Sequence, residues 1–197
     1  MAWRAFFTKS TVSVKPVAME KTLSGKKVAM VIAFRDFRDE EYFLPKQILQ
    51  DQGAEVFTAS NSTGKAVGKL GGDIEVDLLL KDLKPTDYDA VLFVGGPGAY
   101  DYFEDSDCHR IAKETADSGK ILGAICIAPA ILAKAGVLRG KKATVWSSAL
   151  DKSAVKILED SGAVFQQEKV VVDGKIATAS GPEAAEQFGQ TIANLLK

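Results

Sequence analysis

Runs of apolar residues that lack polar alternation mark the central strands of this sequence. The clearest runs are residues 26–34, 89–94 and 121–125, and a further strand is predicted at residues 54–59. Strands that are apolar along their whole length are typical of parallel sheets covered on both faces. The pattern therefore predicts a buried parallel sheet.

Segments with helical spacing alternate with these strands. The predicted helices are residues 42–49, 106–117, 128–135, 151–160 and 182–196. Ser106 and Asp107 are candidate caps for the second of them. Alternation of strands and helices predicts an α/β fold, with helices on both faces of a mainly parallel sheet.

The remaining segments are shorter or less regular. Strands are expected at residues 142–146 and 163–165, and a hairpin at residues 168–179, where Asp173-Gly174 favours a tight turn. Residues 35–41 are expected to form a charged turn and residues 60–72 a glycine-rich loop. Residues 74–83 have no clear assignment.

The stretch from residue 120 to residue 130 changes from strand to helix at Cys126. Pro129 lies where a first helical turn tolerates a missing N–H group. A side chain at such a turn faces the N–H groups of the helix, which favour thiolate over thiol. The arrangement resembles the nucleophile elbow of strand-turn-helix hydrolases. A buried structural cysteine is the alternative, because free cysteines are among the most buried residues.

Other features are expected at the same edge of the sheet as Cys126. The charged turn at residues 35–41 follows the first strand, and the glycine-rich turn at residues 95–100 follows the strand at residues 89–94. The carboxyl ends of parallel strands meet at one edge, where binding sites on such sheets lie. The number of glycines at residues 95–100 indicates that the backbone approaches another group closely there.

Composition narrows the class of protein. The chain has 197 residues, 26 % of them charged, and a formal net charge of −1, so one domain is expected and nucleic acid is not expected as a partner. Its two cysteines do not form a disulfide scaffold, which favours a reducing, cytoplasmic location. No apolar run is long enough to cross a bilayer, so no membrane association is expected.

The amino-terminal residues differ from the rest of the chain. Residues 1–19 contain Arg4, Lys9 and Lys15, and no acid precedes Glu20. This bias is similar to that of an organelle import segment, although a poorly packed terminal extension is the preferred interpretation. We therefore predict an extension at residues 1–25 and a domain at residues 26–197.

Taken together, the motifs along the chain resemble those of the ThiJ/PfpI family, within the class I glutamine-amidotransferase-like superfamily. They are Glu41-x-x-x-Pro45, Gly95-Gly96, Ile125-Cys126-x-x-Pro129, residues 135–138, residues 170–174 and Gly181-Pro182. The resemblance covers about residues 26–197. It implies a flavodoxin-like sandwich with a nucleophile elbow, a homodimer or higher homo-oligomer, and no cofactor or metal.

The resemblance also assigns roles to the residues at the elbow. It makes Cys126 the reactive thiol and Glu41 a carboxylic acid that shares its proton with the sulfur. A carboxyl group beside an anion is pushed towards its protonated form. The N–H groups of Gly95 and Gly96 are expected to hold an oxyanion. From the residues alone, Asp39 and Glu40 are equally plausible partners for Cys126.

The sequence departs from the family at the positions of its catalytic bases. Ile127 replaces the histidine that follows the cysteine in the protease and glyoxalase-like members, and Trp146 replaces the histidine of the parkinsonism-associated branch. Tyr100 stands where the hexameric proteases place an acid, and Ser180 stands where the family usually has a polar or basic residue before Gly181-Pro182. Ile127 and Trp146 are expected to line a fairly apolar pocket, and proteolysis is not expected.

These observations leave two hypotheses from different classes. The first is an enzyme, a thiol-dependent hydrolase, lyase or hydratase that acts on a small carbonyl, amide or nitrile-like compound through Cys126 and Glu41. The second is a redox-sensing or stress-protective protein in which Cys126 is oxidised to a sulfinate, which needs no base. A weaker third is an interaction module that uses Tyr100, Tyr102 and Phe103 as exposed aromatics at a dimer contact.

Two residues near the glycine-rich turn have open roles. His109, the only histidine, is expected to be an exposed structural residue at a helix start. Its neighbour Cys108 is a candidate second reactive thiol, although a surface or interface cysteine is preferred.

Overall fold

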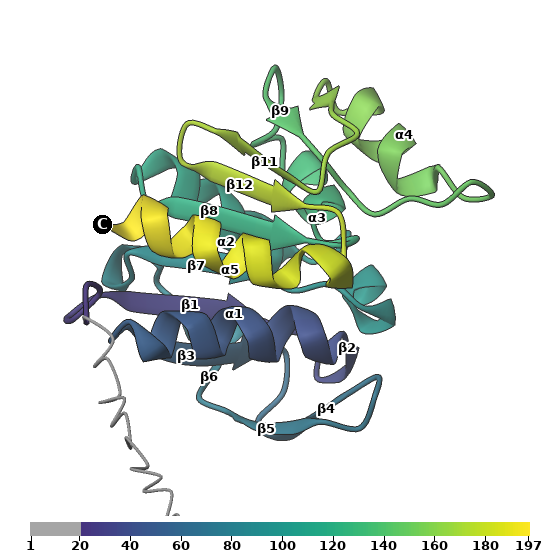
Figure 1. Ribbon diagram of the computed structural model, residues 1–197. Helices are drawn as coiled ribbons and strands as arrows, with labels where there is room; N and C mark the ends of the chain where they lie inside the picture. Colours follow the sequence, from purple (N-terminus) through teal and green to yellow (C-terminus); the bar gives the residue numbers. More distant parts are fainter. Residues whose placement is uncertain (1–20) are drawn as a thin grey trace, which may run out of the picture.

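The central feature of the fold is a mainly parallel sheet (Figure 1). The computed structural model describes residues 21–197, and these form a seven-stranded sheet in the order β11-β12-β8-β7-β1-β3-β6. β11 alone in this sheet runs antiparallel to its neighbour. The strands are β1 (Lys27–Val31), β3 (Glu55–Ser60), β6 (Leu78–Leu79), β7 (Ala90–Phe93), β8 (Ile121–Ile125), β11 (Val170–Asp173) and β12 (Ile176–Ala179).

Helices cover both faces of this sheet, as predicted. The helices are α1 (Asp39–Asp51), α2 (Ser106–Asp117), α3 (Pro129–Lys134), α4 (Ser153–Asp160) and α5 (Ala185–Leu196). Figure 1 shows α1 and α5 together on the near face, with α2 and α3 behind the sheet. The buried apolar side chains fall into two clusters, one that includes Tyr42 of α1 and Phe188 of α5, and one that includes Ile111 of α2 and Leu132 of α3. None of the helices in residues 21–197 has the length and apolarity that a membrane span requires.

Residues 21–25 pack against the domain. Leu23 is fully buried, and its N–H group donates to the carbonyl of Gln52 at 2.8 Å. The last residues of the predicted extension therefore contribute to the core. The import-segment interpretation of residues 1–19 lies outside the described residues.

A second, smaller sheet stands where a charged turn and a glycine-rich loop were predicted. It contains β2 (Arg35–Phe37), β4 (Gly64–Gly68) and β5 (Asp73–Val76) in the order β2-β4-β5. The Asp39 carboxylate fixes this sheet to the start of α1, because it accepts hydrogen bonds from Leu70 N at 2.8 Å and Gly72 N at 2.7 Å. α1 accordingly begins at Asp39, where an acidic first turn favours a helix start, and not at residue 42 as predicted.

The later part of the chain follows the prediction with local differences. The hairpin β11–β12 is confirmed. The strand predicted at residues 142–146 is shorter: β9 (Lys142–Ala143) pairs with β10 (Val164–Phe165) in a separate two-stranded sheet. The predicted caps of α2 are wrong, since Asp105 is its N-cap residue and accepts a hydrogen bond from Cys108 N at 2.8 Å.

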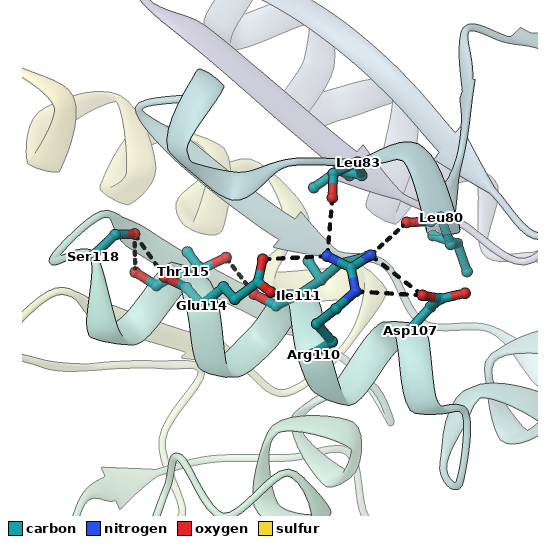
Figure 2. A network of polar contacts seen from close by, with 8 residues as sticks. All are labelled: Leu80, Leu83, Asp107, Arg110, Ile111, Glu114, Thr115 and Ser118. Carbon is teal, nitrogen blue, oxygen red and sulfur yellow. Dashed lines mark hydrogen bonds and ion pairs between the residues drawn. The ribbon is translucent and has the colours of Figure 1, made fainter.

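Residues 74–83, which had no assignment, contain β5, the edge strand β6 and a short 3-10 turn at Leu80–Asp82. Arg110 of α2 holds this turn in place (Figure 2). Its Nη2 donates to the carbonyl of Leu80 at 3.0 Å and its Nη1 to the carbonyl of Leu83 at 3.2 Å. The guanidinium group thus links α2 to the edge of the central sheet.

Candidate active site

The predicted elbow is present at Cys126. The residue joins β8 to the turn before α3 and has a φ of 63°, a conformation that is strained for a residue other than glycine. Its N–H group donates to the carbonyl of Ala179 at 2.9 Å, and its carbonyl accepts from Trp146 N at 2.8 Å. Main-chain hydrogen bonds on both sides therefore hold the strained turn.

Glu41 is the acid that faces the elbow. It lies in the first turn of α1, is fully buried, and its Oε2 accepts a hydrogen bond from Gly95 N at 3.1 Å. Asp39 is bound to the small sheet, and Glu40 forms an ion pair with Arg38 at 2.9 Å. The structure thus separates three adjacent acids that were not distinguishable from the sequence.

Cys126, Glu41 and Gly95 meet at one point. A methyl group placed on Gly95 would lie 2.6 Å from Cys126 Cβ and 2.8 Å from Glu41 Oε2. The thiol and the carboxyl group lie within hydrogen-bonding reach of each other. Among residues 21–197, no group makes a hydrogen bond of good geometry to Glu41 Oε1. Within these residues, this oxygen is therefore not engaged by another hydrogen-bond donor.

Burial controls the charge of both groups. It raises the pKa of Glu41 to about 7, against the opposing effect of hydrogen bonds from Cys126 and Gly95. Burial also raises the pKa of Cys126, and the Glu41 carboxylate raises it further, while the N–H groups of Gly96 and Ile127 lower it. Burial of the sulfur therefore opposes the expected thiolate, and α3, whose N-terminus would favour it, is only six residues long. Burial thus favours a thiol beside a carboxyl group whose pKa is raised.

The glycine turn approaches the elbow closely, as predicted. Gly95 N–H is already bound to Glu41, so only Gly96 of this pair directs its N–H group to the sulfur. Gly96 has a φ of 101°, and a methyl group there would lie 2.6 Å from the carbonyl oxygen of Asp36. Both its conformation and its surroundings require glycine.

The expected pocket differs from the one observed. Trp146 lines a cavity of about 490 Å³ at the carboxyl end of β12, together with Ser180, Lys169 and Glu183. Ile127 is buried and does not line this cavity, and neither does Cys126, which is 9 % exposed. The cavity contains charged side chains and is more polar than expected. Ser180, which departs from the family pattern, faces this cavity and not the sulfur.

Residues around the start of α2 have structural roles. Cys108 is fully buried, so it is not a surface cysteine, and burial raises the pKa of its thiol. His109 is partly buried, and its Nε2 lies 2.8 Å from the carbonyl oxygen of Phe103. Tyr102 is buried and donates to the carbonyl of Ile32 at 3.0 Å, so the prediction that it is exposed is wrong. Tyr100 is 51 % exposed.

Arg38 was not identified from the sequence as a residue of the site. Its backbone N–H donates to the carbonyl of Gly95 at 3.1 Å, and its guanidinium group is held by Glu40 and interacts electrostatically with Glu41 and Cys126. The sequence signal that could have identified Arg38 was a cation inside the acidic stretch after the first strand.

Among residues 21–197, no group of three or more His, Cys, Asp or Glu side chains is placed to hold a metal ion.

Comparison with known proteins identifies the family. Residues 26–195 match the DJ-1/PfpI family. The chain belongs to the DJ-1/PfpI family. This confirms the ThiJ/PfpI resemblance.

Similar proteins extend over most of the chain. An uncharacterized protein of Methanocaldococcus jannaschii is 39 % identical over 170 residues, which are 86 % of this chain and 82 % of that protein. A protein of Thermococcus kodakarensis named a deglycase is 32 % identical over 156 residues, 78 % of this chain and 89 % of its own. The crystal structure of a ThiJ/PfpI domain protein from Brachyspira murdochii matches with a TM-score of 0.83 and 33 % identity, covering 87 % of this chain and 98 % of that chain. The fold prediction is thereby confirmed.

Proposed function

We propose that this DJ-1/PfpI protein is a thiol-dependent enzyme, a hydrolase or lyase that acts on a small carbonyl compound. The observation that carries the proposal is the pairing of a strained, elbow-mounted Cys126 with the buried Glu41 carboxyl group, whose pKa is about 7. An acid with this pKa can both accept and return a proton near neutral pH. The relative named a deglycase is consistent with chemistry at a small carbonyl centre.

The first step follows from the positions of the groups. The Cys126 sulfur attacks the carbonyl carbon while the Glu41 carboxylate removes the thiol proton, so a C–S bond forms as the S–H bond breaks. The electron pair of the C=O π bond moves to oxygen, near the N–H groups of Gly96 and Ile127, which already face the sulfur. Glu41 then returns the proton to that oxygen, giving a neutral adduct that can proceed to products or revert.

Burial of the sulfur argues for a small substrate. Cys126 is 9 % exposed, so an extended peptide does not fit against it without a change of structure. Ile127 and Trp146 provide no base, and Glu41 is the acid among residues 21–197 that we propose for proton transfer. We therefore favour small carbonyl compounds over proteins as substrates.

The unpartnered oxygen of Glu41 favours one second candidate, a redox sensor. Two molecules of peroxide would convert the Cys126 thiol to a sulfinic acid with release of two waters, and the sulfur would lose four electrons. The sulfinate oxygens would face the N–H groups of Gly96 and Ile127 and a protonated Glu41 Oε1. This role needs no turnover of a carbonyl compound.

Matched cysteine variants test the proposal. Turnover of a panel containing a small 2-oxoaldehyde, an amide and a nitrile is measured for the wild type and for Cys126→Ala, Glu41→Gln and Cys108→Ala. We expect the oxoaldehyde to be consumed by the wild type and by Cys108→Ala. Both Cys126→Ala and Glu41→Gln should be slower by about 10²-fold or more. The wild-type rate should rise with pH through about 7 as Glu41 loses its proton.

Full turnover by Cys126→Ala would refute the enzyme proposal. If no compound of the panel is consumed, the proposal also fails. Mass spectrometry after mild peroxide treatment then tests the redox-sensor candidate. This candidate requires two oxygen atoms to be added at Cys126 before any is added at Cys108. It is wrong if both cysteines react equally or if neither reacts.

A further inference from the structure

Lysines gather at the amino-terminal edge of the central sheet, opposite the edge that carries Cys126. Lys26 directly precedes β1, Lys120 precedes β8, and Lys175 precedes β12, while Lys141 precedes the neighbouring strand β9. Lys26 forms an ion pair at 3.7 Å with Asp89, which precedes β7, so the lysines before β8, β9 and β12 carry the excess positive charge on a chain whose formal net charge is −1. Such a concentration of one charge calls for a physical explanation.

A cavity of about 510 Å³, here called the basal cavity, lies at this edge between the ends of α2 and α3 and the β11–β12 hairpin. An adjoining cavity of about 320 Å³ shares Gly119, Lys120 and Lys175 with it. The charged residues that line the basal cavity are Lys113, Lys120, Lys141, Lys175, Asp117 and Asp173. Positive charge therefore exceeds negative charge in its lining.

Two of these lysines have structural partners. Lys141 Nζ lies 3.3 Å from Asp173 Oδ1, and the other oxygen of Asp173 accepts a hydrogen bond from Lys142 N at 2.9 Å. Lys175 Nζ donates to the carbonyl of Gly119, just beyond the end of α2, at 2.5 Å. These contacts fix both ammonium groups at the rim of the basal cavity.

The other two lysines, Lys113 and Lys120, are not needed to complete the end of α2. There the Ser118 hydroxyl donates to the carbonyls of Glu114 and Thr115 at 2.7 and 3.1 Å, as Figure 2 shows. Among residues 21–197, the side chains of Lys113 and Lys120 make neither a hydrogen bond nor an ion pair within 4 Å. Lys120 is nevertheless half-buried in the cavity wall. Lysines outnumber aspartates in this lining, and neither Asp117 nor Asp173 forms an ion pair with Lys120 within 4 Å.

We propose that the basal cavity binds a small phosphorylated molecule. An ammonium group is a compact point charge that suits phosphate oxygens, and a multiply charged anion would relieve the repulsion among the lysines. The apolar part of the lining consists of small and aliphatic residues such as Ala116, Val137 and Ile176, with no aromatic ring on which a nucleobase could stack. The cavity volume suits a phosphorylated sugar or acid.

This site is separate from the proposed active site. Lys120 and Cys126 flank the five residues of β8 and are six residues apart, a span of roughly 20 Å along an extended strand. Ligand binding in the basal cavity therefore does not require the Cys126 thiol, and the inference stands or falls independently of the proposed enzyme activity.

Isothermal titration of the full-length protein with inorganic pyrophosphate tests this inference. The wild type is compared with the double variant Lys113→Gln/Lys120→Gln. The matched control is Lys65→Gln/Lys156→Gln, which removes the same charge from exposed positions on other surfaces. Circular dichroism and thermal unfolding without ligand establish that each variant is folded.

We expect pyrophosphate to bind the wild type, Cys126→Ala and the control double variant with similar affinity. The Lys113→Gln/Lys120→Gln variant should bind at least about tenfold more weakly. Absence of wild-type binding at millimolar pyrophosphate would overturn the inference, as would equal binding by both double variants. A short DNA duplex is titrated in the same way. If it binds the wild type more tightly than pyrophosphate does, and if Lys113→Gln/Lys120→Gln abolishes that binding, the surface binds nucleic acid and the inference is overturned.

Discussion

At the scale of single residues, the notable feature is a buried carboxyl group that forms no ion pair with a cation of residues 21–197. Glu41 is fully buried, accepts one backbone hydrogen bond and faces a thiol. Its proton is therefore bound more tightly in the folded protein than in the unfolded chain. The same raised pKa on which the proposed proton transfer depends should make folding depend on pH.

Replacing Glu41 should reveal this linkage. Burial raises the pKa of Glu41 from 4.5 to about 7, so between these values the folded state holds a proton that the unfolded state has released. The free energy of unfolding should therefore fall as pH rises through this window, by about 3 kcal/mol from this residue. We expect Glu41→Gln to remove that part of the slope, measured by denaturant unfolding from pH 4 to 8. Identical slopes in the wild type and the variant would contradict the assigned pKa.

The site was only partly predictable from the sequence, for a geometric reason. Cys126 was identified because a change from strand to helix is a local pattern. The acids Asp39, Glu40 and Glu41 are consecutive, and successive residues of a helix point about 100° apart, so only one can face the elbow. Which one does so depends on where α1 begins and how it packs, and that is decided by the small sheet that contacts Asp39.

At the scale of elements, the sequence predicted those strands of the central sheet that are buried on both faces. β1, β7 and β8 are apolar because helices cover both of their faces, and their sequences show it. The small sheet was missed because β2 and β4 contain exposed or glycine residues and pair across about 30 intervening positions. Such pairing depends on long-range contacts and leaves little local signal.

Arg110 is the clearest test of how an edge element is held. Arg110→Ala removes the hydrogen bonds to the carbonyls of Leu80 and Leu83, so we expect a loss of about 2 kcal/mol in the free energy of unfolding. Hydrogen exchange at Leu83 N–H, which donates to Leu80 O, should accelerate. Arg110→Lys keeps the charge near Asp107 and Glu114 but lacks the planar fork, so it should recover less than half of the loss. Full recovery by lysine would show that charge alone matters.

At the scale of the whole molecule, the sheet divides the core into two apolar clusters. The cluster under α1 and α5 is closed at one end by Leu23, which precedes the first strand. Residues outside the repeating strand-helix units thus complete the core. The sequence analysis placed residues 21–25 in an extension, because a single apolar residue such as Leu23 does not produce a periodic hydrophobic pattern.

Truncating Leu23 should therefore destabilise the entire domain. Leu23→Ala removes a fully buried side chain, so we expect a loss of about 2–4 kcal/mol in the free energy of unfolding. The matched control is Leu44→Ala in α1, where the side chain is 45 % exposed and the expected loss is below about 1 kcal/mol. Equal effects in chemical denaturation would mean that residues 21–25 do not contribute to the core in solution.

The hydrogen bond from Trp146 to the elbow has a consequence for how this protein diverges from other DJ-1/PfpI members. The donor is a main-chain N–H group, so the indole takes no part in holding Cys126 in its strained conformation. A different side chain at position 146 could therefore keep this main-chain contact to Cys126. The backbone that holds the elbow and the side chains around it can vary separately at this position.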